Sequence, residues 1–119
     1  MNFIVRKEEN YSLIKVVNNR LDSFISPELK AEIVMISSKQ ERNIILDLSD
    51  CVYCDSSGLS AILVGNRLCE KSAGTFIICN LSQNVDKMIK LAMLDSILEI
   101  TSNLEEAEKL LLIKKSEII

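Results

Sequence analysis

Residues 44–68 read IILDLSDCVYCDSSGLSAILVGNRL, and this stretch decides the fold of the chain. It opens with a nearly continuous apolar run that is rich in β-branched residues, a pattern typical of a central strand covered on both faces. Beyond the polar segment Asp55-Ser56-Ser57-Gly58, apolar residues recur at helical spacing at Leu59, Ile62 and Leu63. The stretch therefore predicts a buried strand, a loop and an amphipathic helix.

Upstream of this stretch, the chain predicts a β-hairpin. Two β-prone runs, Phe3–Val5 and Leu13–Val17, flank a polar turn around Glu8–Asn10. Consecutive strands with a short polar connection usually pair. The pair Asn18-Asn19 then breaks the second strand.

A helix is predicted to follow the hairpin. Ser26 is expected to cap it and Pro27 to take its first helical position, with Glu28 in the first turn, where the helix dipole favours an acidic residue. The helix should end in the polar stretch 37–42. Its buried stripe is predicted to be Leu29, Ile33 and Ile36.

The second half of the chain alternates strands and helices. Gly74 is expected to close the turn before a buried strand at Thr75–Cys79. Ser82 is expected to cap the next helix, Ile97–Ile100 to form a short last strand, and Asn103 to cap a final amphipathic helix. The apolar face of the helix after Ser82 is predicted to be Val85, Met88, Ile89 and Ala92.

The resulting order is β-β-α-β-α-β-α-β-α, which predicts an α/β fold with a mixed, largely parallel central sheet flanked by helices. A chain of 119 residues without a linker or repeat predicts a single domain over residues 1–119. Ile44–Leu48 and Phe76–Cys79 are the expected central strands, and their side chains should be almost fully buried.

Composition excludes several function classes. The net charge is −3, so no basic surplus favours nucleic acid as a partner. The chain has no histidine, which excludes a Ser-His or Cys-His catalytic pair and every His-ligated metal site within it. Aromatic residues make up 4%, too few to suggest a base-stacking platform. No cofactor and no metal are expected.

The N-terminal sequence MNFIVRKEEN carries charges where a signal peptide needs its apolar core. No apolar run approaches the roughly 20 residues that span a bilayer. We therefore expect a cytoplasmic protein without membrane insertion. Thiols stay reduced in that compartment, so the four cysteines are expected to be small buried hydrophobic residues.

The segment Asp55-Ser56-Ser57-Gly58 is the candidate site, because ligands of α/β sheets gather at the carboxyl ends of strands. Asp55 or Ser56 is expected to cap the following helix. Ser57 then falls in the first turn, and its hydroxyl is expected to be exposed and to point outward. Free N–H donors and the helix dipole favour an anion such as a phosphate there. Gly58 is expected to leave room beside the Ser57 hydroxyl for another protein. The plain alternative is a capped helix start without a further role.

Residues 44–68 resemble the central motif of the STAS family, in particular of the bacterial anti-sigma factor antagonists. In that family, a strand ending Leu-Asp-Leu-Ser is followed by a loop, by Asp-Ser-Ser-Gly-Leu and by a helix. Asn19–Asp22, Ile77–Ile100 and Asn103–Ala107 resemble other parts of the family less specifically. The resemblance covers almost the whole chain.

The resemblance implies a phosphorylation switch in a protein that is not itself an enzyme. The unmodified antagonist binds an anti-sigma factor, often a serine kinase, and so frees a sigma factor. The kinase phosphorylates the second serine of the motif, which matches Ser57, and a PP2C-type phosphatase reverses the change. Two positions depart from the family: Asn19 replaces a turn glycine, and Gln83 stands where proline is frequent.

Other functions remain open from the sequence. The same fold serves as an accessory subunit of lipid-transport ATPase complexes. The Cys51-x-x-Cys54 pair resembles a thioredoxin-like redox site, but the helix begins too late to lower a thiol pKa and the only proline, Pro27, precedes the pair. A zinc site is disfavoured because Cys69 and Cys79 lack a second CxxC spacing.

We predict that the thiols are free and structural. Cys51→Ala or Cys54→Val should lower the free energy of unfolding by about 1–3 kcal/mol, the cost of a modest core change. Denaturant unfolding under reducing conditions measures this cost, and partner binding should survive there. A Cys51–Cys54 disulfide required for function would contradict the prediction.

Overall fold

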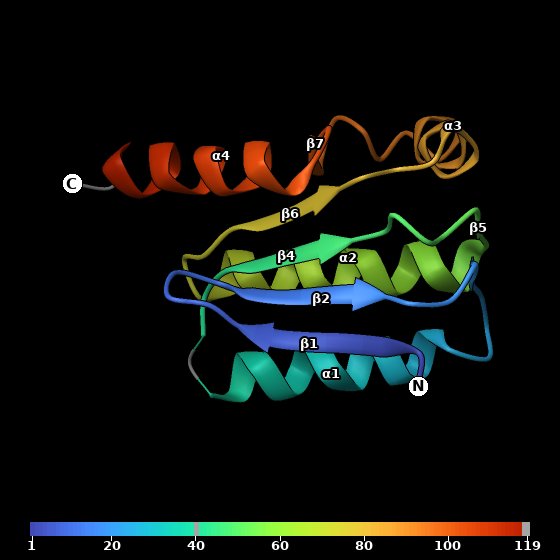
Figure 1. Ribbon diagram of the computed structural model, residues 1–119, viewed down its shortest axis with the longest axis horizontal. Coiled ribbons are helices and arrows are strands. Elements are labelled where there is room, and N and C mark those ends of the chain that lie inside the picture. Colours follow the sequence, from blue (N-terminus) through green and yellow to red (C-terminus); the bar gives the residue numbers. More distant parts are fainter. Residues whose placement is uncertain (40, 118–119) are drawn as a thin grey trace.

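The computed structural model describes residues 1–39 and 41–117 as a five-stranded sheet with helices on both faces (Figure 1). The elements follow one another as β1 (Phe3–Lys7), β2 (Ser12–Val16), β3 (Arg20–Leu21), α1 (Ser26–Ser38), β4 (Ile44–Asp47), β5 (Tyr53–Cys54), α2 (Ser56–Lys71), β6 (Phe76–Cys79), α3 (Gln83–Leu91), β7 (Glu99–Thr101) and α4 (Leu104–Glu117). The predicted α/β class and the order of its main elements are confirmed.

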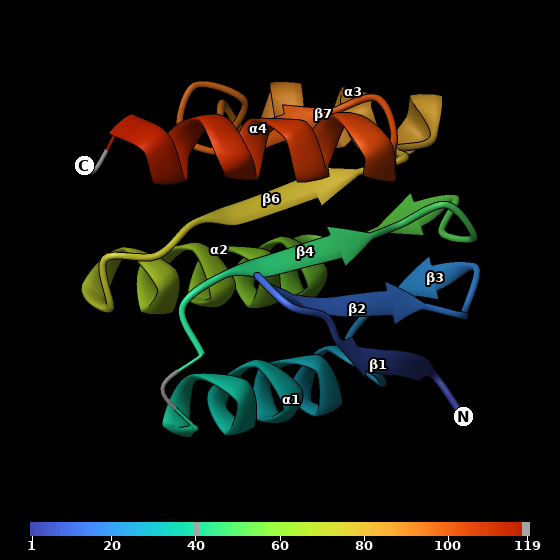
Figure 2. The ribbon, with the colours of Figure 1, turned by 60° about the vertical axis from the view of Figure 1, so that its left-hand side comes forward.

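The sheet has the strand order β1-β2-β4-β6-β7. The pair β1–β2 is the predicted antiparallel hairpin, and every other neighbouring pair in this sheet is parallel. In Figure 2, where the molecule is turned by 60°, α4 lies beside β6 and β7. The sheet is therefore mixed and largely parallel, as predicted. The two-residue strands β3 and β5 form a separate parallel pair that the sequence did not predict.

Two hydrophobic cores lie on opposite faces of the sheet. The larger contains side chains of α1, α2 and α3, and the smaller lies under α4. Along β4, Ile44 and Leu46 point into the larger core and Ile45 into the smaller one. The strand β6 alternates in the same way. All residues of Ile44–Leu48 and Phe76–Cys79 are buried, which confirms the prediction of two doubly covered strands.

The start of α1 differs from the prediction. Pro27 lies in the first turn as expected, but Ser26 does not cap the helix with its side chain. The Ser26 hydroxyl instead donates to the carbonyl of Asp22 at 2.6 Å, because the chain turns back over that carbonyl before the helix begins. The helix ends at Ser38, inside the predicted stretch.

The end of α2 also differs. Ala73, with φ at 59°, takes the left-handed position that closes the helix, and Gly74 follows it. The Gly74 N–H donates to the Cys69 carbonyl at 2.7 Å, the long bond of a Schellman motif. Glycine is needed at position 74 for space, since an added Cβ would lie 1.8 Å from the carbonyl oxygen of Arg42.

The later caps follow the prediction more closely. The Ser82 hydroxyl accepts from the Val85 N–H at 3.2 Å, and the Asn103 side chain accepts from the Glu106 N–H at 2.8 Å. The last strand covers Glu99–Thr101 instead of starting at Ile97. Within the helix after Ser82, Val85 and Ile89 are buried, Met88 is half-buried and Ala92 is exposed.

Close packing between α2 and β6 depends on a glycine in the middle of the helix. A Cβ at Gly65 would lie 2.5 Å from the ring of Phe76, which is itself buried. The helix therefore touches the strand through its own backbone at this point. This approach sets the distance between α2 and the sheet.

Gly65→Ala should lower the free energy of unfolding by about 1–2 kcal/mol, because the cost of overpacking against Phe76 exceeds the gain in helix propensity. Urea unfolding measures the difference. Ser60→Ala is the matched control in the same helix, since Ser60 is exposed, and it should be neutral or slightly stabilising. A Gly65→Ala protein as stable as the unchanged chain would contradict this packing.

Candidate functional site

The candidate site lies at the carboxyl edge of the sheet, where the chain leaves β4 and enters α2. Asp55 is the N-cap residue of α2, with an extended backbone, and its carboxylate accepts from the Gly58 N–H at 3.0 Å. The Asp55 carbonyl accepts from the Leu59 N–H, also at 3.0 Å. Asp55 and Ser56 were the two predicted candidates for the cap, and Asp55 is therefore the residue that caps α2.

Ser57 lies in the first turn of α2, as predicted. Its exposure differs from the expectation: Ser57 is half-buried, and its neighbour Ser56 is the exposed serine. The described first turn of α2 contains no acidic side chain. An anion on this turn would meet backbone N–H groups and the positive end of the helix dipole, so the position can accommodate a phosphate.

Gly58 has a structural role that the sequence did not reveal. It is buried, and an added Cβ would lie 2.4 Å from the Leu21 carbonyl oxygen and 2.6 Å from the Cys54 sulfur. The expectation that Gly58 leaves room for another protein is therefore wrong, because α2 itself fills that room by starting directly against β3.

The short β3–β5 pair holds the site in place. In its register, Arg20 lies opposite Tyr53 and Leu21 opposite Cys54. The Leu21 carbonyl accepts from the Asp55 N–H at 3.2 Å, so the cap residue of α2 is bonded to β3. Strands of two residues have no periodicity that a sequence pattern can reveal.

Asn19, which stands where the STAS family usually has glycine, contributes to the β3–β5 arrangement. Its carbonyl accepts from the Val52 N–H at 2.8 Å and from the Tyr53 N–H at 3.2 Å. Asn19 is not among the residues with positive φ, so the turn does not require the glycine that the family usually has there.

The thiols near the site are buried and free. The Cys51 thiol donates to the Tyr53 carbonyl at 3.1 Å, and burial raises the pKa of this thiol. Burial, together with the nearby Cys51 and Asp55, raises the pKa of Cys54 to about 12. A raised thiol pKa is typical of an inert structural cysteine and opposite to that of a redox-active one. In the part of the chain that the structure describes, no group of side chains could hold a metal ion.

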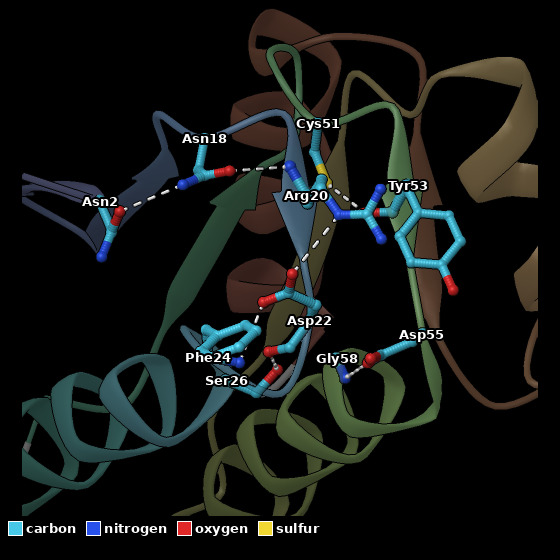
Figure 3. A network of polar contacts seen from close by, with 10 residues as sticks. All are labelled: Asn2, Asn18, Arg20, Asp22, Phe24, Ser26, Cys51, Tyr53, Asp55 and Gly58. Atoms are coloured by element: carbon cyan, nitrogen blue, oxygen red, sulfur yellow. Dashed lines mark hydrogen bonds and ion pairs between the residues drawn. The ribbon is translucent and has the colours of Figure 1, made fainter.

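Beside the start of α2, the loop between β3 and α1 is organised by Asp22 (Figure 3). Its carboxylate accepts from the Phe24 N–H at 3.0 Å and lies 3.5 Å from Arg20 Nε. Its carbonyl accepts from the N–H groups of Ile25 and Ser26 at 3.2 and 2.9 Å. This loop leaves Phe24 89% exposed.

The Arg20 guanidinium lies over the Tyr53 ring, 4.4 Å from its centroid. The sequence analysis predicted neither the stack of Arg20 on Tyr53 nor the exposure of Phe24. The sequence did contain one indication of the loop: Asp22 lies two residues before Phe24, which is the spacing of an Asx turn.

None of the helices in residues 1–39 and 41–117 combines the length and the apolar character needed to cross a bilayer.

The exposed residues near the site are a mixture of polar and apolar side chains on short loops.

Comparison with known proteins gives consistent matches. The chain is 26% identical over 106 residues to the anti-sigma-B factor antagonist of Bacillus subtilis, covering 88% of this chain and 96% of that protein. An anti-sigma factor antagonist from Mycobacterium paratuberculosis has a TM-score of 0.82 at 20% identity, covering 92% of each chain. The Bacillus protein SpoIIAA matches in its unphosphorylated form (TM-score 0.70, 21% identity, 98% of this chain and 99% of that one) and in its phosphorylated form (TM-score 0.71, 21% identity, 91% and 98%).

The solved structures share less than a quarter of their residues with this chain, so they show the fold alone. The family follows from a sequence model described as the STAS domain, which matches residues 2–107. Since that match spans most of the chain and includes the strand, the loop and the capped helix just described, this chain belongs to the STAS family.

Proposed function

We propose that this protein is an anti-sigma factor antagonist that acts by binding and is switched by phosphorylation of Ser57. In its unmodified form it binds an anti-sigma factor of the serine-kinase type, which then releases its sigma factor. Membership of the STAS family supports this proposal, as do the names of the similar proteins.

The observation that carries the proposal is the position of Ser57 in the first turn of α2, behind the Asp55 cap. In the proposed reaction, the kinase transfers the γ-phosphoryl group of ATP to the Ser57 oxygen. The hydroxyl proton is released and ADP leaves. A PP2C-type phosphatase then hydrolyses the phosphoester with water and restores the serine.

The phosphate would weaken the complex with the partner and would leave the stability of the fold nearly unchanged. At a helix N-terminus it is favoured by free N–H groups and by the dipole. In a desolvated interface its charge costs several kcal/mol unless a cation pairs with it. About 2.7 kcal/mol already weakens a complex a hundredfold. Modification should therefore release the partner from a protein that stays folded.

In this proposal the chain is a binding protein and the kinase supplies the chemistry, so the chain itself is not an enzyme. Because ATP and sigma factors are found in the cytoplasm, the proposed reaction takes place there. An accessory subunit of a lipid-transport ATPase complex would share the fold but would copurify with transporter subunits. It would also accept no phosphate from a serine-kinase anti-sigma factor.

The first test is direct. The purified chain is incubated with ATP and with each serine-kinase anti-sigma factor of its own genome. Trypsin should then release residues 43–67 as one peptide containing Ser49, Ser56, Ser57 and Ser60. Fragmentation of that peptide should place the phosphate on Ser57. Phosphate on another serine, or on none, would contradict the assignment.

The second test compares variants at neighbouring serines. Ser57→Asp should weaken the complex with the kinase about a hundredfold, because it puts charge into the interface. Its melting temperature should stay within about 2 °C of the unchanged chain. Ser57→Ala should bind and resist phosphorylation. Ser56→Ala is the matched control and should bind and accept phosphate normally, since Ser56 is exposed and is not the helix cap.

A further inference from the structure

The strand β1 forms one edge of the main sheet, and in the described part of the chain no strand lies beyond it (Figure 1 and Figure 2). Its five residues, Phe3–Lys7, are enough to pair with another strand. The opposite edge is β7, which has three residues. Edge strands expose backbone groups that can pair with a second chain, and a very short edge strand reduces this tendency. The unprotected edge is therefore β1.

The direction of the free backbone groups follows from the pairing of β1 with β2. Asn2 and Glu8, which flank β1, are each bonded at 2.8 Å to the residue opposite them beside β2. Antiparallel strands alternate between hydrogen-bonded and non-hydrogen-bonded pairs, so the even-numbered residues of β1 bond to β2. The N–H and C=O groups of Phe3, Val5 and Lys7 therefore point outward. Within residues 1–39 and 41–117 these groups have no hydrogen-bond partner.

The middle of this edge is apolar. Ile4 is 41% exposed and Val5 is 42% exposed. Charged side chains along an edge normally discourage pairing. The two basic residues of the strand, Arg6 and Lys7, instead form ion pairs with carboxylates of their own chain at 3.6 and 2.8 Å. Their charges are compensated locally, and the apolar part of the edge stays accessible.

The helix α1 runs beside β1 in the same direction (Figure 1 and Figure 2). At the start of both elements, the Asn2 side chain donates to the Glu28 carboxylate at 2.9 Å. Beyond the end of the helix, Lys7 Nζ donates to the Glu41 carboxylate at 2.8 Å. A symmetry axis that reverses β1 therefore reverses α1 as well.

The side of α1 that carries Glu28 is acidic at its start and basic at its end. Glu32, Met35 and Lys39 follow Glu28 at helical spacing, so the four residues lie within about 60° of one another around the helix. Met35, in the middle of this stripe, is 53% exposed. In the part of the chain that the structure describes, Glu32 and Lys39 belong to no ion pair. The stripe therefore has two free charges of opposite sign, one toward each end.

We propose that β1 pairs with β1 of a second copy of this chain, antiparallel, about a two-fold axis at Val5. In this register, Phe3 lies opposite the partner's Lys7 and Val5 opposite the partner's Val5. All outward backbone groups then find a partner, because each of these pairs exchanges two hydrogen bonds. The sheets of both copies become one continuous sheet through a self-complementary interface. This inference does not depend on the proposed function.

The same axis lays α1 antiparallel to the partner's α1. Met35 lies near the axis, since both Met35 and Val5 fall between the two contacts that join α1 to β1. Glu32 then lies toward the partner's Lys39, so that unlike charges meet across the interface. A parallel arrangement would place each charge beside its own copy. The charge pattern of α1 therefore favours the same antiparallel arrangement as the backbone groups of β1.

Sedimentation equilibrium over micromolar to millimolar concentrations tests the dimer, which should have twice the mass of the chain. Val5→Lys should raise the dimer dissociation constant at least tenfold, because it puts like charges directly opposite each other at the axis. Ile113→Lys is the matched control and should dimerise normally, since Ile113 is 56% exposed on α4. Glu32→Lys and Lys39→Glu should each weaken the dimer about threefold, and the double variant should recover most of the loss.

Amide exchange followed by NMR identifies the strand that pairs. In the dimer, the N–H groups of Phe3, Val5 and Lys7 should exchange slowly. In Val5→Lys at the same concentration, those of Phe3 and Lys7 should exchange rapidly, while those of Ile4 and Arg6 stay protected and show that the variant is folded.

Two results would overturn the proposal. One is a chain that stays monomeric at every concentration, including a monomer that adds a strand of a different protein at β1. The other is a dimer in which the outward amides of β1 exchange rapidly, because the two copies would then meet through another surface. A double charge variant as weak as the single ones would overturn the pairing of α1 with its copy.

Discussion

The burial of β4 on both faces is the constraint on which the rest of the structure depends. Its residues Ile44 and Leu46 face one core and Ile45 faces the other. A slip of one residue would send every side chain to the wrong face, so the register is strongly specified. Leu13, Ile45 and Ile77 lie in line across three neighbouring parallel strands of the sheet. The point at which β4 ends, and therefore where the loop to α2 begins, is fixed by this packing.

The path from β4 to the start of α2 is held in place by hydrogen bonds that pair its buried polar groups. Asp47 is only 8% exposed, and its carboxylate accepts from the Ser49 N–H at 2.9 Å and from the Asn80 side chain at 3.1 Å. It thus ties the end of β4 to the residue that follows β6. The Leu48 N–H donates to the Cys79 carbonyl at 3.1 Å and extends the same connection. Buried polar groups that are fully paired favour a single local structure.

The sequence predicted the features that depend on periodicity and failed where contacts between distant segments or the conformation of a loop decide. The buried strands at 44–48 and 76–79, the hairpin and the helix with Ser57 in its first turn follow from local patterns. The role of Gly58 does not, because the Leu21 carbonyl that fills its space is far away in the sequence. The Ser26 hydroxyl bonds to Asp22 instead of capping α1, since the fold brings a carbonyl within 2.6 Å. Similarly, the exposure of Phe24 depends on how the Asp22 loop is folded.

At the start of α2, the residues that hold the helix in place are different from those that are accessible at the surface. Asp55 and Gly58 are engaged internally, the first as the cap and the second in contact with β3. Ser56 and Ser57 lie between them at the boundary with solvent. The contacts that position the start of α2 use backbone atoms and the Asp55 carboxylate, so among the described residues they do not depend on a serine hydroxyl in this turn. A charge added to a hydroxyl there would change the exposed surface and would leave the bonds that hold the turn intact.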